Sequence, residues 1–484
     1  MKLNYKRTIL VGFAFFLISA FWQAYDAIVP LILTNHYGLS QTVSGTVMSL
    51  DNILAVFLLP IFGAISDKIM TRLGRRTPFI IVGTVAAVIS FIFLAVMDAA
   101  QLSRLADEGI IDAYNATKAA LDSAREAGNE ALVALHEEGL EKIAERVHEI
   151  TLGNLWPVVG FIGVLLVVLL SMAIFRSPVV ALMPDVTVKP LRSKGNAIIN
   201  LMGAAGGILV LALGIVFGTS KNLYMSYVGY VLAVIGIMVA GLVVFVLTVK
   251  EKTWAQEMEA ESERLGIEER TESDGGEKKK LSRPELISLM LILASVALWY
   301  IGYNSITSKY SVYATNILGF DYNATLIVAQ AAAIVSYIPV GIVSSKFGRR
   351  KTILAGVAML ATAFLLGYFI TPNVHPLVMY PIFMLAGIGW ATINVNSFPM
   401  VVELARGGDV GKYTGYYYTA SMAAQIIAPI LSGALYDLLG MRHVFFIFGT
   451  VFVALSFVTM FFVKHGDAKP EKQDALEALA GAED

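Results

Sequence analysis

The stretch GAISDKIMTRLGRRTP, from Gly63 to Pro78, separates two long apolar segments and gathers one acidic and four basic residues between them. A weaker copy, GIVSSKFGRRKT from Gly341 to Thr352, lies at the matching place in the second half of the chain. An apolar helix that ends in Gly-x-x-x-Asp, followed by a Gly-Arg-Arg turn and a second apolar helix, is typical of a charged loop at a membrane face. Its repetition predicts a chain built from two similar halves.

The composition places the chain in a membrane. Of the 484 residues, 57% are hydrophobic and 15% are charged, and the mean hydropathy is +0.69. The chain has no cysteine, which excludes disulfides and thiolate metal sites. A helix of about 20 apolar residues crosses a hydrocarbon core of about 30 Å. Recurring stretches of this kind predict an all-α membrane protein with twelve transmembrane helices, near residues 8–34, 42–65, 78–97, 155–175, 195–218, 224–249, 285–312, 322–345, 352–371, 377–401, 413–436 and 443–464.

Basic residues gather on one side of the predicted membrane. They lie before the first span, in the Gly63–Pro78 loop, at 176–194, in 250–284 and at 346–351, whereas the short loops of the opposite side carry few. Loops on the cytoplasmic side carry an excess of Lys and Arg. We therefore expect both termini in the cytoplasm and a multi-pass protein of the plasma membrane.

Polar segments divide the chain into domains. Residues 98–154 are rich in Ala, Glu and Leu and predict a helical insertion on the outer face, either a solvated cap or a surface that gathers substrate. Residues 250–284 are a mixed-charge run with a Gly-Gly break, expected to be a cytoplasmic linker, and 465–484 a cytoplasmic tail. The linker separates an N-terminal six-helix bundle, 1–249, from a C-terminal one, 285–464.

A second pair of motifs extends the repeat. RSPVVALMPD, from Arg176 to Asp185, and NSFPMVVE, from Asn396 to Glu403, each follow their Gly-Arg-Arg loop by one hydrophobic hairpin and place Ser, Pro and an acid near a helix end. Spans 3, 6, 9 and 12 hold almost no strongly polar residue in their interiors, as helices packed outside a central cavity would. Two parallel repeats of six spans are a transporter architecture with a mid-membrane site between the halves.

The Gly63–Pro78 loop resembles the loop 2–3 signature of the major facilitator superfamily. Its form, with Ser-Asp before the insert and Gly-Arg-Arg-Thr-Pro-Phe after it, is similar to sucrose-type proton symporters within the glycoside–pentoside–hexuronide:cation symporters. RSPVVALMPDVT with SKGNAIINLMG resembles those proteins after helix 4, and GIGWATINVNSFPMVVE and YYYTASMAAQIIAPILSG resemble their helices 10 and 11. The resemblance implies two bundles that rock about a central sugar site, coupled to inward cation flow.

Two carboxylates lie at similar depth on consecutive predicted helices. Asp26 is about eight residues from the outer end of its span, and Asp51 about nine residues into the next. Burial and like charge both disfavour the ionised form, so such acids can exchange a proton near neutral pH and are predicted to couple transport to protons. Pairing of each acid with a hydroxyl or helix end near the outer mouth is the alternative. The sodium-linked, melibiose-type branch has its paired acids at helix 2 positions that are Ala55 and Leu59 here, which favours the proton.

Amide, aromatic and hydroxyl side chains without fixed charge lie on the spans expected to line the cavity. Amides satisfy hydroxyl groups as donor and acceptor, and aromatic faces stack on pyranose C–H groups, so the set suits a neutral sugar. Interhelical hydrogen bonding is the alternative role. Lys309, in the outer part of span 7, is expected to snorkel outward. The predicted substrate residues are Trp22, Gln23, Asn52, Asn196, Asn200, Trp299, Tyr300, Tyr303, Asn304, Gln330, Trp390, Asn394, Ser421 and Gln425.

Charged residues at the cytoplasmic helix ends form a predicted gate. Ion pairs there would hold the outward-facing state and break when the interior opens. Retention by the positive-inside rule is the alternative reason for their presence. The predicted gate residues are Asp67, Arg75, Arg76, Arg176, Asp185, Arg349, Arg350 and Glu403.

These features together predict a secondary transporter that carries a neutral sugar, a disaccharide or glucoside, by proton-coupled alternating access. The alternatives are a drug or metabolite exporter of the same superfamily, against which the proline-free GAAGGILVLALG of span 5 argues, and a non-transporting membrane sensor or scaffold. The sequence shows no nucleophile–base constellation, metal-ligand cluster or phosphate-binding glycine loop. We therefore expect a monomer that is not an enzyme and that binds no cofactor, metal or nucleic acid.

Overall fold

The computed structural model describes residues 3–265, 282–404 and 410–466. Within these ranges the secondary structure is entirely helical, and twelve helices are long and apolar enough to cross a membrane. They fall at the twelve predicted places. The predicted fold class, an all-α protein with twelve membrane helices, is therefore confirmed.

The N-terminal bundle holds the first six spans, and α1 packs chiefly on α7 while α3 packs on α6. Its spans are α1 (Tyr5–Leu31) with the π-helical turn η1 (Ile32–His36), α2 (Gln41–Lys68), α3 (Thr77–Asp107), α6 (Trp156–Asp185), α7 (Arg192–Phe217) and α8 (Val228–Thr248). Ser40 caps α2, because its side chain accepts the Val43 N–H at 3.3 Å.

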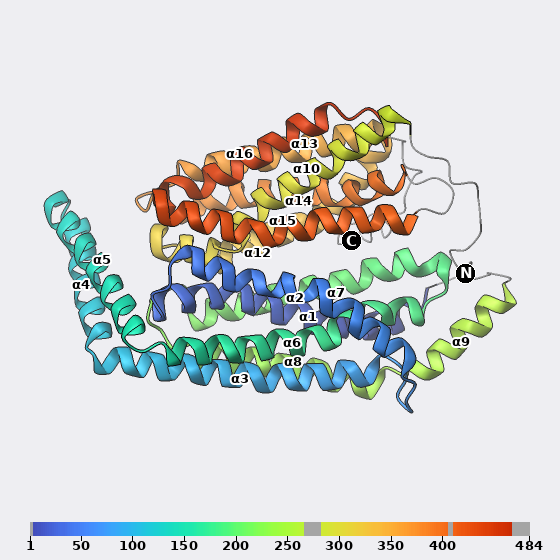
Figure 1. Cartoon of the computed structure of the whole chain (residues 1–484), viewed down its shortest axis with the longest axis horizontal. Helices are drawn as coiled ribbons and strands as arrows, with labels where there is room; N and C mark the ends of the chain where they lie inside the picture. The colour runs from blue at the N-terminus through green and yellow to red at the C-terminus, as the bar shows by residue number, and fades with distance from the viewer. Residues whose placement is uncertain (1–2, 266–281, 405–409, 467–484) are drawn as a thin grey trace.

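The C-terminal bundle lies beside the first (Figure 1) and begins with a broken span. Its seventh span consists of α10 (Arg283–Thr307), α11 (Tyr310–Val312) and the π-helical turn η3 (Tyr313–Leu318). The others are α12 (Tyr322–Phe347), α13 (Arg349–Tyr368), α14 (Met379–Val402), α15 (Val410–Leu439) and α16 (Met441–Phe461). A Ser282–Glu285 capping box starts α10, as the Ser and Glu spacing favours.

The two ends of the bundles carry different extra helices. At one end, which we call the linker face, α9 (Glu251–Arg264) follows α8. At the opposite end, the hairpin face, α4 (Ile110–Glu126) and α5 (Glu130–Gly153) project as a helical hairpin (Figure 1). Residues 266–281 of the predicted linker and 467–484 of the predicted tail lie outside the described residues.

Two predicted helix ends are wrong by ten residues. Helix α3 continues to Asp107 rather than 97, so the insertion starts later than residue 98. Its extension is held by tertiary contacts: Asp98 is fully buried and its Oδ1 lies 2.5 Å from His36 Nδ1. Helix α6 continues to Asp185 rather than 175, through Pro178 and Pro184. Hydropathy ends a predicted span at the first polar residues, whereas these helices continue where polar groups find partners.

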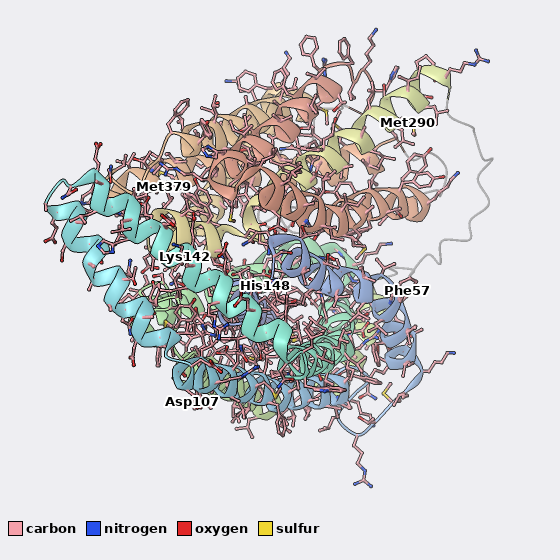
Figure 2. The ribbon with its side chains drawn as sticks, turned by 60° about the vertical axis from the view of Figure 1, so that its left-hand side comes forward. Phe57, Asp107, Lys142, His148, Met290 and Met379 are labelled. Carbon is pink, nitrogen blue, oxygen red and sulfur yellow. The ribbon has the colours of Figure 1, made fainter. Side chains whose placement is uncertain are left out.

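The hairpin is anchored to the N-terminal bundle by an apolar cluster and by hydrogen bonds of the described residues. Its base is an apolar cluster that consists of Leu102, Leu105, Ile110, Tyr114, Val147, Ile150 and Tyr224. His148 Nδ1 lies 2.8 Å from the Gly38 carbonyl oxygen, and Arg104 donates to the Ile150 carbonyl at 3.0 Å. Figure 2 shows Lys142 and His148 along α5, and Asp107 at the end of α3. The hairpin therefore moves with the N-terminal bundle.

Candidate functional site

A cavity of about 470 Å³ lies at mid-depth between the bundles. Helices α1 and α7 form its N-terminal wall, and α10, α12 and α14 form its C-terminal wall. Gly203 of α7 leaves room on that wall, since a Cβ there would lie 2.8 Å from Ser19 Oγ. A site shared by both halves is the arrangement that alternating access requires.

Seven of the predicted coupling and substrate residues line this cavity. They are Trp22, Gln23, Asp26, Tyr303, Asn304, Gln330 and Trp390. Several further residues line the cavity that were not predicted from the sequence, among them Ser19, Ser311, Phe364 and Phe383. Small hydroxyl residues and phenylalanines are common throughout membrane helices, so composition alone gave no signal for them.

The polar side chains of the cavity are held by one another. Gln330 Nε2 donates to Gln23 Oε1 at 2.6 Å, which joins the two bundles across the cavity. Tyr303 and Trp390 stack with ring centroids 3.6 Å apart and an interplanar angle of 5°. Asn304 Nδ2 donates to the Tyr300 carbonyl at 2.8 Å, which fixes the amide on α10. The cavity therefore presents positioned amides beside an aromatic face.

A cluster of charges lies behind the Trp22 ring. The Asp26 side chain is exposed to the cavity, whereas Asp51 is half-buried and accepts a hydrogen bond from Asn52 Nδ2 at 2.8 Å. The Arg176 guanidinium lies 5.5 Å from the centre of the Trp22 ring and interacts electrostatically with both carboxylates. Asp51, Trp22 and Arg176 meet around a small void. The two acids thus share one half-buried arginine as an electrostatic partner.

Arg176, predicted as a gate residue, lies away from the linker-face ends of the helices. Helix α6 extends nine residues beyond Arg176 to Asp185, which places the guanidinium about 13 Å inside the linker-face end of the helix. The predicted span ended at 175 because the sequence becomes polar there. The arginine instead compensates the carboxylates of α1 and α2 within the bundle.

The other predicted substrate residues do not line the cavity. Trp299 is fully buried in the core of the C-terminal bundle, and Tyr300 packs edge-on against Trp390 with centroids 5.3 Å apart. Asn394 lies one turn beyond Trp390 toward the linker face. The remaining residues bond within their own helices or lie near helix ends, and they are Asn52, Asn196, Asn200, Ser421 and Gln425. A helical stripe shows which residues share a face, but the rotation of each helix decides which part of that face is open.

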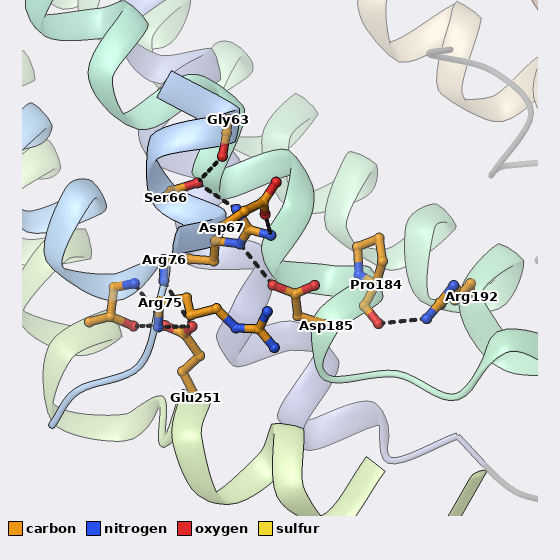
Figure 3. Close-up of polar contacts among 10 residues, drawn as sticks. Gly63, Ser66, Asp67, Arg75, Arg76, Pro184, Asp185, Arg192 and Glu251 are labelled. Carbon is orange, nitrogen blue, oxygen red and sulfur yellow. Dashed lines mark hydrogen bonds and ion pairs between the residues drawn. The ribbon is translucent and has the colours of Figure 1, made fainter. Parts of the chain in front are cut away.

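The Gly63–Pro78 loop is ordered by an acid that the sequence analysis had left in the linker. Glu251, at the start of α9, is buried, and its carboxylate accepts the N–H groups of Arg75, Arg76 and Thr77 at 2.6 to 2.8 Å (Figure 3). It also accepts the Thr77 hydroxyl at 2.7 Å. Gly74, with φ of +122°, makes room for the carboxylate. An acid at the N-terminus of α3 satisfies donors that have no partner within the helix.

The Arg76 side chain binds three further groups. Its guanidinium contacts Asp67 at 2.5 Å, Asp185 at 2.8 Å and Ser66 Oγ at 2.5 Å (Figure 3). These partners come from α2 and α6, so Arg76 ties the linker-face ends of three N-terminal helices together. Arg75 contributes its backbone N–H to Glu251.

The matching residues of the second half bind within the C-terminal bundle. Arg349 pairs with Glu403 at 2.5 Å. Arg350 donates to the Met460 and Phe461 carbonyls at the end of α16. Each of the linker-face contacts named here joins helices of one bundle. Their role as a gate between the bundles therefore stays a prediction.

Several hydrogen bonds join the two bundles near the hairpin face. Asp437 of α15 accepts the N–H groups of Gln41 and Thr42 at the start of α2. Asn35 and Asn316 exchange two amide hydrogen bonds, at 2.7 and 3.3 Å. Further bonds join Thr219 with Tyr322 and Asn323. The hairpin face of the cavity is therefore closed.

The prediction that Lys309 snorkels outward is wrong. Its side chain is fully buried at the break between α10 and α11, where Nζ donates to Ser44 Oγ of α2 at 2.5 Å. The contact with the other bundle covers the amine when the hairpin face is closed. No group of three or more metal-binding side chains occurs in the described ranges.

Two six-helix bundles that share a mid-depth cavity define the class of membrane transporters that work by alternating access. The family model of the Major Facilitator Superfamily matches residues 150–408 and 324–481, and that of the MFS/sugar transport protein matches residues 10–104. These matches extend over more than half of the chain, which therefore belongs to the Major Facilitator Superfamily. The superfamily part of the resemblance is confirmed.

Individual relatives share the fold rather than the sequence. The MFS-type transporter ppzB of Metarhizium rileyi (strain RCEF 4871) is 28% identical over 125 residues, or 26% of this chain, and the match spans only a quarter of that relative's length. The inward-open xylose transporter XylE from E. coli matches with a TM-score of 0.60 at 14% identity, over 98% of this chain and 99% of that one.

Solved transporters for other substrates match as well. A mutant form of the nucleoside transporter NupG has a TM-score of 0.56 at 12% identity, over 94% of this chain and 100% of that one. A POT family transporter in complex with 5-aminolevulinic acid has a TM-score of 0.60 at 12% identity, over 94% and 95%. At these identities the likeness shows the fold alone.

Proposed function

We propose that this transporter carries a neutral sugar, a disaccharide or glucoside, together with a proton. The linker face would lie in the cytoplasm and the hairpin face outside the cell, in the plasma membrane. The observation that carries the proposal is the composition of the cavity wall. Asp26 is the one charged residue among the described residues that line it, and it stands among amide, hydroxyl and aromatic side chains.

The cavity offers the groups that a neutral polyol needs. Trp22 Nε1 and Gln330 Oε1 have no hydrogen-bond partner among the described residues, so a small rotation of either side chain would offer a donor or an acceptor to a hydroxyl group in the cavity. Tyr303 stacked on Trp390 supplies an aromatic surface for the C–H face of a pyranose. A substrate with a fixed charge would lack a compensating group other than Asp26. This contrast favours a sugar over a charged peptide.

The charge cluster behind Trp22 suits coupling to one proton. Asp26, Asp51 and Arg176 carry a net charge of −1 when both acids are ionised, and the cluster is neutral when one acid holds a proton. The free-energy cost of placing the cluster in low-dielectric surroundings is smaller when its net charge is zero than when it is −1. The proton would therefore load at Asp26, the acid that the cavity solvent reaches, while Arg176 stays beside Asp51.

Reconstitution tests the proposal. Proteoliposomes would be assayed for sugar accumulation driven by a pH gradient and for counterflow exchange without one, across a panel of disaccharides, glucosides and nucleosides. Asp26→Asn should abolish proton-driven accumulation and preserve exchange, because the amide still hydrogen-bonds but cannot release a proton. Asp122→Asn, on the exposed face of the hairpin, is the matched control and should behave as the unmodified protein.

Two outcomes would contradict the proposal in different ways. Accumulation by Asp26→Asn with its pH dependence intact would remove Asp26 from coupling. Exchange of nucleosides without exchange of any sugar would reassign the cargo and leave the coupling assignment standing.

A further inference from the structure

The closed hairpin face contains a buried lysine amine that has no carboxylate within hydrogen-bond distance among the described residues. Lys309 lies at the break of span 7, is 0% exposed, and has Ser44 Oγ as the hydrogen-bond partner that the described residues provide. An ammonium group has three N–H donors and loses a large hydration energy on burial. The closed state therefore leaves this cation poorly compensated.

Asp437, an acid of the same bundle, makes its hydrogen bonds elsewhere. Asp437 interacts electrostatically with Lys309, but its carboxylate accepts the N–H groups of Gln41 at 2.8 Å and Thr42 at 2.7 Å, and the Thr42 hydroxyl at 2.5 Å. An anion at a helix N-terminus is favourable, so this contact stabilises closure. In the closed state, the Asp437 carboxylate therefore accepts hydrogen bonds from α2 and not from the lysine.

Lys309 and Asp437 belong to the same bundle, whereas their partners belong to the other. Tyr436 donates to the Ser305 carbonyl at 3.1 Å and holds the end of α15 beside the break that contains Lys309. Ser44, Gln41 and Thr42 all lie in the first turns of α2. A movement of α2 away from α15 removes the partners of both groups together, while Lys309 and Asp437 stay in one bundle.

We propose that Lys309 and Asp437 exchange partners when the hairpin face opens: they release Ser44 and the α2 N-terminus and pair with each other within the C-terminal bundle. The buried cation favours opening, and the Asp437 contact with α2 favours closure. The pair therefore sets the equilibrium between the open and the closed hairpin face. This effect does not depend on which substrate is carried.

Single-cysteine labelling tests this exchange, since the chain has no cysteine of its own. Ala204→Cys lines the cavity on α7, in the opposite bundle from Lys309. An impermeant maleimide added on the hairpin side reports how often that face opens. Leu135→Cys, 58% exposed on the hairpin, identifies vesicles in which the hairpin side faces the reagent.

Lys309→Met should lower the labelling rate of Ala204→Cys at least about threefold, because it removes the uncompensated cation from the closed state and the new pair from the open state. A lysine that merely tied the bundles together through Ser44 would give the opposite sign, with faster labelling. Unchanged or faster labelling of Lys309→Met would therefore overturn the proposal.

A double variant tests the pairing separately. Asp437→Asn cannot pair with the lysine, but it also loses one of the two carboxylate oxygens that accept hydrogen bonds from the start of α2, which weakens the closed state. In the Asp437→Asn background, Lys309→Met should therefore slow labelling less than it does alone, since both variants remove the same pair. Equal slowing in the two backgrounds would contradict the exchange. Lys309→Gln, which keeps a donor for Ser44, takes the place of Lys309→Met if the latter folds poorly.

Discussion

At the scale of single residues, Glu251 orders the whole Gly-Arg-Arg-Thr loop. Its buried carboxylate accepts three backbone N–H groups and one hydroxyl, and the residue comes from a helix that lies 174 positions further along the chain than Thr77. Glu251→Ala should lower the free energy of unfolding of the N-terminal bundle by about 3 kcal/mol, because buried donors would lose their acceptor. Thermal or urea unfolding in detergent measures this loss.

The matched control lies on the same helix. Glu257 is about half exposed and pairs with Arg7, so Glu257→Ala should change the free energy of unfolding by about 1 kcal/mol or less. Glu251→Gln keeps one acceptor oxygen and should fall between the two. Equal losses from Glu251→Ala and Glu257→Ala would show that the loop does not depend on the carboxylate.

Residue identity predicted some of the side chains that line the cavity. Asp26, Gln23 and Trp390 are among them, and they were predicted because polar and aromatic residues are conspicuous inside apolar spans. Glu251 and Lys309 were misjudged, because their roles depend on partners that lie far away in the sequence. From the sequence alone, a carboxylate in a mixed-charge run is expected to be solvated. The burial of Glu251 becomes evident only when α9 is seen to pack against the Gly63–Pro78 loop.

At the scale of elements, the hairpin of α4 and α5 tests whether this appendage is needed for transport. Val147 is fully buried in the apolar cluster at its base. Val147→Asp should release the hairpin, because an unpaired charge in that cluster is costly. Hydrogen exchange of residues 110–153 should become at least about tenfold faster, as expected when local opening becomes easier.

Transport should persist in Val147→Asp, since the observed hairpin contacts stay within the N-terminal bundle and away from the cavity. Leu135→Asp, on the exposed part of α5, is the control and should leave hydrogen exchange at the base unchanged. Loss of transport with a folded membrane domain would instead favour the interpretation that the insertion gathers substrate.

Element positions were predictable because length and hydropathy fix a membrane span almost by themselves. The errors at α3 and α6 arose where a polar residue inside a helix finds a partner: Asp98 with His36, and Arg176 with the two acids. Hydropathy counts each such residue as though it faced lipid. Spans with satisfied polar groups are therefore predicted too short.

At the scale of the whole molecule, the close approach of α2 and α15 is what closes the hairpin face. Gly45 of α2 packs against the backbone of Pro429, and Gly433 of α15 packs against the backbone of Gln41. A Cβ at either glycine would overlap the opposite helix. The two glycines therefore permit a closed state that larger residues would prevent, which the sequence could not show because it does not reveal which helices face each other.

Gly45→Val should hold the hairpin face open, because the added side chain collides with a backbone that has no freedom to rotate away. Labelling of Ala204→Cys from the hairpin side should rise about fivefold or more, substrate should still bind, and transport should fall to background, since a carrier held in one state cannot cycle. Gly236→Val is the control, because a Cβ there meets nothing within 4 Å. Normal transport by Gly45→Val would contradict this prediction. It would mean that the hairpin face can close without contact between α2 and α15, and that other helices control its opening and closing.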